Sequence, residues 1–446
     1  MSPQEVEMSE ANPLPSGGHI IIGGGATGAL CAVKLAEAGF KVTVLEQALV
    51  GNGSSSRSAA CIRAQFGVPE TVLGMVYSEQ WYTDIHEHLH TPADQREQVL
   101  VANGYLFLWE DPESVELWNR KGRRVTEETM RQVRSNVDMQ QALGLPVELL
   151  GVNEVQARWP HLNGEQMWRI GAATWCPTDG FLKHDLIYML GFRRARELGV
   201  TVLENAEVVS AKLEGGRIRG VYLADGRLVE GDVVINCTNA WGPRLSRALG
   251  GMELPIKPIK RYLAFTPKPV NVDPEGWRKL PMTIYGMGPG RVAYSRPDAG
   301  SLMTGWAHDA DPDPNFTSED QDRIEAGFNG KVEPPYSHLM INQVREFAPS
   351  LVPPTNEGIS MTCGYYGDTP DHSPLIGWDE QVDGLMHACG FSGHGLMHAP
   401  ITARLVTELV KGQRGEVQLN GRINAPLKLG SFAPARDFSH VESHVL

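Results

Sequence analysis

Residues 19–46, HIIIGGGATGALCAVKLAEAGFKVTVLE, carry the pattern that decides the fold of this chain. Ile20–Ile22 form a continuously apolar run, which is typical of a strand buried on both faces. Residues 29–39 place apolar side chains at helical spacing and end on a glycine, which is a helix-stop signal. Residues 40–45 are predicted to form a second strand, and Glu46 follows it at once. The predicted order is strand, glycine turn, helix, strand and acid.

Three glycines between the first strand and the helix have the spacing of a dinucleotide-binding turn. Gly23 would make the tight turn, Gly25 would let backbone approach a pyrophosphate, and Gly28 would let the helix pack on the strand. Glu46 lies 18 residues after Gly28, near the spacing of a carboxylate that binds ribose hydroxyls. The simpler alternative is a glycine-rich turn in an unrelated parallel sheet. Both strands, the helix and the acid together favour a Rossmann-like α/β fold with the phosphate on the helix N-terminus.

Size and charge exclude several classes of function. The 446 residues suffice for two domains, and the net charge of −13 argues against a nucleic-acid partner, which needs clustered Lys and Arg. No apolar run is long enough to span a bilayer, so we expect no membrane partner. The six cysteines are scattered without metal-type spacing, which predicts no metal site and free thiols in a cytoplasmic protein. Residues 1–18 lack the pattern of a signal peptide and are predicted to be a disordered tail.

A group of histidines lies in residues 70–95, which we expect to be helical. His86, His88 and His90 resemble a metal cluster, but their spacing puts only the first and third on one helical face. No cysteine or carboxylate pattern completes a site around them. They are therefore interpreted as solvated helix histidines.

Turn signals divide the middle of the chain. Residues 99–109, VLVANGYLFLW, are predicted to form a hairpin around Asn103-Gly104. Turn pairs at Gly215-Gly216 and Asp225-Gly226 predict further hairpins through residues 213–232. Residues 232–241 form a buried strand that ends in small polar residues, at the edge where parallel sheets bind ligands. Residues 256–310 alternate apolar and polar positions, which predicts antiparallel strands of a second domain.

Two loops are rich in small residues. Residues 51–67 contain many serines, which can bring hydroxyls and backbone donors close to a bulky polar ligand, although a flexible linker is the alternative. Residues 390–395, GFSGHG, follow a predicted strand at 385–389 and precede a helix from about Ala399. This second loop again places glycines at a helix N-terminus, where negative charge is favoured.

Three separated motifs resemble the D-amino acid oxidase superfamily of flavoproteins. They are the fingerprint with Glu46, the strand end Asn239-Ala240-Trp241, and Thr369-Pro370-Asp371 together with the GFSGHG loop. The resemblance covers nearly the whole chain from residue 19 and is strongest to the sarcosine oxidase and glycine oxidase branch, including the sarcosine oxidase beta subunit. It implies a Rossmann-like FAD-binding domain and a second α+β substrate domain built on a mostly antiparallel sheet.

The resemblance also implies that both domains are discontinuous. The FAD-binding domain would take residues 19–85, 146–255 and 350–446, the last with a C-terminal tail. The substrate domain would take residues 86–145 and 256–349.

The chemistry implied by the resemblance is oxidation of a C–N bond in an amino acid, most closely an N-substituted, sarcosine-like one. Hydride would pass from the carbon beside nitrogen to flavin N5, and water would hydrolyse the imine. O₂ or another acceptor would reoxidise the flavin, which leaves oxidase and dehydrogenase activity both open.

Many residues are expected to contact FAD by this resemblance. They are Gly23, Gly25, Ala26, Thr27, Gly28, Glu46, Gln47, Ser54, Ser55, Ser56, Arg57, Ser58, Ala60, Val208, Thr238, Trp241, Gly364, Gly390, Ser392, Gly393, His394, Gly395, Leu396 and Met397.

Five residues are candidates for the substrate site. Arg63 matches a family arginine that binds substrate carboxylate, a task that suits the planar fork of a guanidinium, although a surface or flavin-contacting arginine is the alternative. Tyr366 and Tyr294 match family tyrosines, and either could instead be a packed aromatic. His308 follows the position of a family histidine, and His394 lies in the GFSGHG loop.

Several positions depart from the family pattern. Gly364 stands where some members attach flavin through a cysteine, and Arg57 stands where others use a histidine, so we predict non-covalent FAD. Cys363 is one position off and would point to the opposite strand face. Met303 and Met397 replace two family lysines, which weakens the expectation of an oxidase and of a strong carboxylate clamp.

Two other functions stay open. A 2-hydroxy acid oxidoreductase would need a base for the hydroxyl proton, for which His308 or His394 would be the candidate. The chain could also be a homo-oligomer or the flavin-bearing subunit of a larger complex, since its tails permit an assembly.

Overall fold

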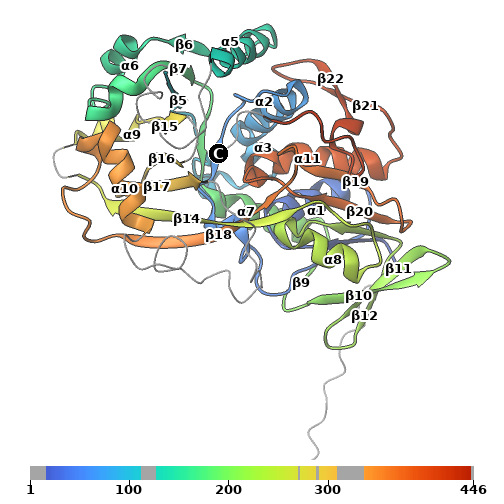
Figure 1. Cartoon of the computed structure of the whole chain (residues 1–446). Helices are drawn as coiled ribbons and strands as arrows, with labels where there is room; N and C mark the ends of the chain where they lie inside the picture. Colours follow the sequence, from blue (N-terminus) through green and yellow to red (C-terminus); the bar gives the residue numbers. More distant parts are fainter. Residues whose placement is uncertain (1–16, 112–126, 270–271, 288–290, 309–335, 443–446) are drawn as a thin grey trace, which may run out of the picture.

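Two large sheets organise the computed structural model, which describes residues 17–111, 127–269, 272–287, 291–308 and 336–442. They lie in two lobes, and the chain passes repeatedly from one lobe to the other (Figure 1). The predicted tail at residues 1–18 falls almost wholly outside the described residues.

The first sheet has six strands in the order β19-β20-β13-β1-β2-β9. Their bounds are β19 Leu375–Trp378, β20 Leu385–Cys389, β13 Val233–Asn236, β1 His19–Ile22, β2 Val42–Leu45 and β9 Thr201–Leu203. β20, β13, β1, β2 and β9 run parallel, and β19 is antiparallel to β20. The carboxyl ends of these parallel strands therefore meet at one edge, the ligand-binding edge of such sheets.

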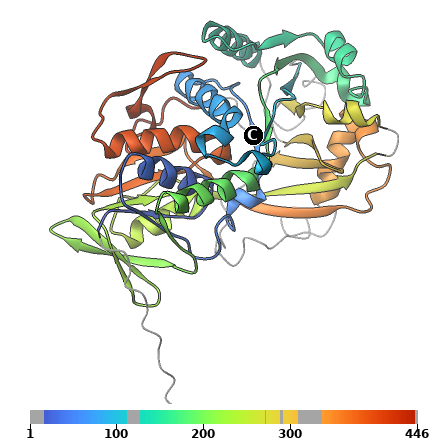
Figure 2. The same ribbon diagram turned by 180° about the vertical axis from the view of Figure 1, so that it is seen from behind.

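Both faces of this sheet are buried, as the isoleucine run predicts. Ile21 packs against helices α1 (Ala26–Glu37), α7 (His184–Glu197) and α11 (Gly395–Val410). Ile20 and Ile22 face a three-stranded antiparallel sheet of β10 (Val208–Glu214), β11 (Arg217–Leu223) and β12 (Leu228–Glu230). The view from behind shows α1 and α7 side by side across the sheet (Figure 2), where Gly191 lets α7 approach Ala29 closely.

The second sheet has eight strands in the order β18-β14-β17-β16-β15-β5-β7-β6. Their bounds are β18 Ser360–Asp368, β14 Lys257–Pro267, β17 Ser301–His308, β16 Arg291–Asp298, β15 Met282–Met287, β5 Tyr105–Glu110, β7 Ile170–Cys176 and β6 Glu148–Leu150. All its pairs are antiparallel except β15 with β5, so the predicted mostly antiparallel substrate sheet is confirmed.

Helix α10 (Tyr336–Phe347) covers the outer face of the eight-stranded sheet through Met340, Val344 and Phe347. The inner face, with Phe107, Leu263, Ile284, Tyr294 and Met303, is turned toward residues 59–61 of the serine-rich loop. This sheet therefore roofs the ligand-binding edge of the first one.

The remaining described elements are peripheral to these two sheets. They are β3 (Cys61–Ile62), β4 (Leu100–Val101), β8 (Gly180–Leu182), β21 (Glu416–Leu419), β22 (Ala425–Lys428), α2 (Pro69–Thr83), α3 (Ile85–His88), α5 (Glu127–Ala142), α6 (Val152–Arg158), α8 (Gly242–Ala248) and α9 (Pro274–Arg278), with short 3₁₀ turns between them.

The predicted hairpin at residues 99–109 is wrong. β4 pairs with β8, while β5 pairs with β7 and β15, so the chain changes sheets at Asn103-Gly104. Asn103 donates from Nδ2 to the carbonyl of Leu280 at 3.2 Å, which holds the crossing against a distant loop. Long-range pairing overrode a local turn signal here.

The structure also differs from the predicted domain division at residue 146. The family resemblance predicts that residues 146–255 belong to the FAD-binding domain, whereas β6 and β7, which lie within them, are strands of the eight-stranded sheet. The helical prediction for residues 70–95 corresponds to α2 and the single turn α3, and His88 stacks on Trp81 at 5.0 Å.

Within the described ranges, no group of three metal-binding side chains occurs, and no helix has the length and hydropathy to cross a bilayer. All six cysteines carry thiol groups.

Candidate active site

The first glycine turn adopts the geometry that its sequence predicts. Gly23 has φ of +113°, and a Cβ there would lie 2.7 Å from the carbonyl oxygen of Cys237 at the end of β13. The Glu46 carboxylate accepts from the Gly24 amide at 2.6 Å and from the Ala48 amide at 2.9 Å. Burial raises the pKa of this carboxyl. Glu46, which follows β2, thus lies beside the glycine turn that leads into α1.

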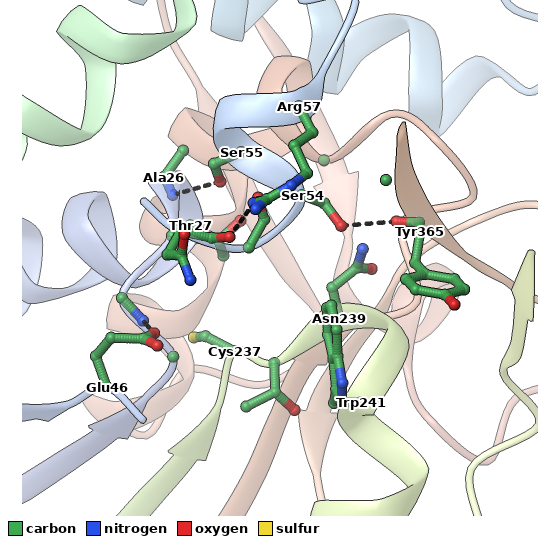
Figure 3. Close-up of a pocket in the computed structure, with 18 of the residues that line it drawn as sticks. Ala26, Thr27, Glu46, Ser54, Ser55, Arg57, Cys237, Asn239, Trp241 and Tyr365 are labelled. Atoms are coloured by element: carbon green, nitrogen blue, oxygen red, sulfur yellow. Dashed lines mark hydrogen bonds between the residues drawn. The ribbon is translucent and has the colours of Figure 1, made fainter. Parts of the chain in front are cut away.

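A serine loop closes over this turn from the other side. Ser55 Oγ accepts from the Ala26 amide at 3.1 Å, and Ser54 Oγ donates to the Tyr365 carbonyl at 2.8 Å. The Arg57 guanidinium donates to the Gly53 carbonyl at 3.0 Å. Figure 3 shows these side chains on one side of the cavity, with Glu46 and Trp241 on the other. The loop therefore connects the start of α1 with strand β18.

The second glycine loop has the left-handed backbone that its composition suggests. Gly390, Ser392 and Gly393 have φ of +69°, +47° and +85°. Ser392 Oγ accepts from the Thr369 amide at 3.1 Å, and the Phe391 amide donates to Asn239 Oδ1 at 3.1 Å. The helix begins at Gly395, so the predicted start near Ala399 is wrong by one turn. Pro400 lies inside that helix, in its second turn.

A cavity of about 350 Å³ lies between the two glycine loops and the eight-stranded sheet. Most of the residues predicted to contact FAD line it: Gly23, Gly25, Ala26, Thr27, Glu46, Gln47, Ser54, Ser55, Arg57, Ser58, Val208, Thr238, Trp241, Gly364, Gly393, Gly395 and Leu396. The others are not among the residues that line it: Gly28, Ser56, Ala60, Gly390, Ser392, His394 and Met397.

Several lining residues are not among the site residues that the sequence predicts. Asn52, Arg244, Arg261 and Tyr365 belong to none of the three motifs, whereas Asn239 and Phe391 belong to motifs but are not predicted to contact the ligand. The φ of Asn239, +48°, is the left-handed conformation that asparagine tolerates. Arg261 lies on strand β14, where nothing in the local pattern distinguishes it from a surface cation.

Two tyrosines occupy the roof of the cavity, and both were predicted from the sequence. The Tyr294 ring takes the space that a side chain at Gly305 would need, because a Cβ there would lie 2.0 Å from its Cζ. The Tyr366 ring lies over Gly393 in the same way, 2.4 Å from a Cβ at that position. The two hydroxyls hydrogen-bond to each other, and burial raises the pKa of both phenols. The roof thus presents a polar pair directly above the second glycine loop.

Arg63 is buried behind that loop, with 1% of its surface exposed. Its guanidinium lies 3.8 Å from the Phe66 ring centroid, and Nη2 lies 3.5 Å from His394 Nε2. Burial and the Arg63 charge hold the pKa of His394 well below its usual value, so this imidazole is neutral. Its Nδ1 is buried without a hydrogen-bond partner among the described residues.

The segment that carries Arg63 is held by two buried carboxylates. Asp179 Oδ1 accepts from the Ala64 amide at 3.1 Å, and Oδ2 accepts from Gln65 Nε2 at 3.0 Å. Glu442, near the end of the chain, accepts from the amides of Gly67 and Val68 at 2.7 and 3.0 Å. Those amides lie at the N-terminus of α2, where the helix dipole favours a carboxylate. The C-terminal segment therefore supports the candidate substrate-binding loop.

The other positions discussed in the sequence lie on strands β17 and β18 and on helix α11. His308 is the last residue of β17, and its side chain lies outside the described residues. Met303 and Met397 are both buried in apolar clusters. Cys363 packs in the cluster on the outer sheet face, opposite to the cavity that Gly364 lines.

The cavity fits a dinucleotide. The N-cap residues of the two helices that point at it, α1 and α11, make no side-chain cap. The Ala26 amide of α1 already donates to Ser55 Oγ, so anionic groups can bind the amides that follow it in the first turn of α1 and those that begin α11. Side chains at Gly25 and Gly393 would meet Ser55 Oγ at 2.8 Å and the Tyr366 ring at 2.4 Å. Because glycine has no side chain, a flat ligand can approach the backbone closely at both positions.

Comparison with known proteins decides the family. Residues 19–409 match the family described as "DAO: FAD dependent oxidoreductase". The chain belongs to this family. It is therefore an FAD-dependent oxidoreductase related to amino acid oxidases and dehydrogenases, and its cofactor is FAD. This confirms the fold class and the resemblance drawn from the sequence.

Several relatives of this family member span most of the chain. FAD-dependent oxidoreductase domain-containing protein 1 of Xenopus laevis is 26% identical over 429 residues, which cover 88% of this chain and 78% of that protein. Sarcosine oxidase subunit beta of an Arthrobacter species is 26% identical over 60% of this chain and 63% of its own length. The crystal structure of L-proline dehydrogenase from P. horikoshii has a TM-score of 0.73 at 26% identity and covers 95% of this chain and 98% of its own.

FAD should be released when the holoprotein of this DAO family member is denatured in acid. Gly364 offers no thiol, Arg57 offers no imidazole, and the Cys363 side chain lies on the far sheet face. Precipitation in acid followed by absorbance of the supernatant measures the release. Yellow colour retained in the washed pellet would contradict non-covalent binding.

The stability of the protein should fall on acidification because of His398. Burial lowers the pKa of this histidine to about 4, whereas the unfolded chain titrates near about 6.5. The unfolded state therefore binds more protons between these values, which costs about 2 kcal/mol of stability at about pH 5. His398→Gln should flatten the dependence of Tm on pH between about pH 7 and pH 5. An unchanged slope in the variant would contradict the assignment.

Proposed function

We propose that the enzyme oxidises the C–N bond of a secondary, N-substituted amino acid. The observation that carries this proposal is the buried Arg63 guanidinium beside the second glycine loop, with the Tyr294 and Tyr366 hydroxyls above it. A guanidinium binds carboxylate through two parallel hydrogen bonds, and a water-excluded site strengthens them. An amino acid anchored there would lie under the roof of the cavity.

The names of two relatives support the choice of a secondary amine. Sarcosine oxidase and L-proline dehydrogenase are named for substrates in which the amine nitrogen carries a second carbon. Both relatives match this chain at 26% identity. A substrate of the same kind is therefore the first to test here.

FAD, held between the two glycine loops, would supply the oxidising power, because a flavin can accept a hydride from the carbon beside nitrogen. The chain supplies binding and orientation. Arg63 binds the substrate carboxylate, and Tyr294 and Tyr366 line the side of the site where the amine lies. His394 is neutral, so it adds no positive charge that would oppose hydride loss. The N-terminus of α11 faces the cavity and stabilises negative charge that develops there. The imine product is then hydrolysed by water.

The electron acceptor is proposed to be something other than O₂ alone. Met303 is fully buried at the position where the family resemblance expects a lysine that assists oxygen. Without that positive charge, an oxyanion formed from oxygen is less stabilised. Reoxidation by a quinone-type dye should therefore be faster than reoxidation by air-saturated buffer.

An anaerobic titration of the holoenzyme tests the function. Secondary amino acids, primary amino acids, 2-hydroxy acids and simple amines are added separately, and the flavin absorbance is followed. Bleaching by secondary amino acids, and not by simple amines, is expected. If the whole panel leaves the flavin oxidised, the proposed substrate class is wrong.

The same experiment tests the alternative of a 2-hydroxy acid oxidoreductase. Bleaching by 2-hydroxy acids would require a base, and the low pKa of His394 makes it a poor one at neutral pH. A subunit that needs a partner would bind FAD and stay oxidised with every class. Size-exclusion chromatography then reports whether the chain assembles with itself.

A further inference from the structure

A second guanidinium lies in the roof of the cavity. Arg261 is half-buried on strand β14 and lines the same cavity as both tyrosines. Its Cζ lies 5.5 Å from the centroid of the Tyr366 ring. No motif in the sequence contains Arg261, and the function proposed above does not use it.

The register of the sheet explains why this side chain reaches the cavity. Arg261 pairs with Gly364, and two residues further along β14 Leu263 pairs with Gly305. Directly paired residues point to the same face, so Arg261 shares the inner face with Gly364, Gly305 and Tyr294. The neighbouring cation Lys260 points to the outer face, where it lies 5.6 Å from the Tyr365 ring centroid.

The two guanidinium groups approach the Tyr366 hydroxyl from separate elements. The charges of Arg261, on β14, and Arg63, in the segment after β3, both act to lower the pKa of that phenol. Arg261 acts on the Tyr294 phenol in the same direction. Tyr366 therefore lies within electrostatic reach of both cations, next to the second glycine loop.

The acidic side chains that line the cavity lie at its other end. Of the described residues that line it, the carboxylates are Glu46 and Glu207. Both lie beside the first glycine turn, where the Ala206 amide donates to the Glu46 carbonyl at 2.8 Å. Asp179 and Glu442 hold the backbone behind Arg63 and do not line the cavity, so the described lining residues of the substrate half include no carboxylate, and an anionic group would complement the Arg261 charge in the roof.

We propose that the substrate carries a second anionic group beyond the carboxylate bound by Arg63, and that Arg261 binds this group. The substrate class is then an N-substituted amino acid with a dicarboxylate skeleton. The inference rests on the proposed function, because it assigns the first carboxylate to Arg63. It makes Arg261 the residue that determines specificity for the distal end of the substrate.

Binding of non-oxidisable acids to the holoenzyme tests the inference without turnover. Succinate is compared with butyrate, and glutarate with pentanoate, because each pair differs by one carboxylate in place of a methyl group. The perturbation of the flavin spectrum gives each Kd at low ionic strength, where screening is weak. We expect each dicarboxylate to bind at least about tenfold more tightly than its partner, as a charge-assisted hydrogen bond allows.

Three variants identify the residue responsible. Arg261→Gln should abolish the dicarboxylate preference and leave butyrate affinity within about twofold of wild type, since Arg63 is intact. Lys257→Gln is the matched control: it removes one exposed positive charge from the same strand and should keep the preference. Arg261→Lys should retain part of the preference, and it replaces the glutamine variant if that variant does not bind FAD.

Equal affinities of wild type for the two members of each pair would overturn the inference, as would a preference that survives in Arg261→Gln. Both outcomes are distinct from failure of the proposed function. That failure would appear as a flavin that no amino acid reduces, whatever the acids do to its spectrum.

Discussion

Gly28→Ala should give a colourless protein of reduced stability. A Cβ at this position would lie 2.0 Å from the Gly23 carbonyl oxygen and 3.5 Å from the Ile21 side chain. The first of these is a backbone atom, so no side-chain rotation can relieve the contact. Overpacking of this kind costs about 1–3 kcal/mol, and here the helix must also move away from the turn that binds the pyrophosphate.

The ratio of flavin to protein absorbance measures the first effect, and Tm measures the second. Gly430→Ala is the control, because a Cβ there meets nothing within 4 Å and its backbone is not in the left-handed region. The control should keep both FAD and stability. A stoichiometric flavin content in Gly28→Ala would contradict the role of the close helix–strand approach.

Arg63→Gln should lower the affinity for carboxylate ligands by about 100-fold, or about 3 kcal/mol, while FAD stays bound. The side chain is 1% exposed and packs on the Phe66 ring, so the amide cannot reach the same partners. The charge of Arg63 also lowers the pKa of His394. Its removal should therefore raise that pKa toward the ordinary value for histidine.

Two measurements separate these effects. The Kd of butyrate, read from the flavin spectrum, reports carboxylate binding, and the pH dependence of that Kd reports His394. Arg63→Lys is the matched variant: it keeps the charge but loses the planar fork, so it should fall between wild type and glutamine. Unchanged butyrate affinity in Arg63→Gln would mean that the carboxylate binds elsewhere, with Arg261 the next residue to test.

Local patterns predicted the cofactor half of the molecule well. The run from Ile20 to Glu46 gave a strand, a turn, a helix and a second strand, and all four are present. The acid at its end accepts from the Gly24 amide within the same turn. Such predictions succeed because every contact involved lies within one continuous segment, where spacing along the chain is spacing in the fold.

Predictions that depended on distant partners did less well. The turn signal at Asn103-Gly104 is real, since Gly104 has φ of +86°, yet the strands on either side of it join different sheets. Arg261 gave no signal at all, because its place in the cavity follows from its pairing with Gly364, 103 residues away. The support of the Arg63 segment by Glu442 likewise joins two ends of the sequence.

The sequence by itself determined the parallel sheet and the two glycine-lined helix starts, because glycine spacing and strand hydrophobicity act over a few residues, and the flavin followed from the resemblance of three motifs to a flavoprotein family. Only the tertiary structure decided which side chains of the second sheet line the cavity. Sheet register sets that choice, since a shift of one residue turns a side chain to the opposite face. Register is fixed by pairing between strands that the chain brings together from far apart, and Arg261 is the residue for which this mattered most.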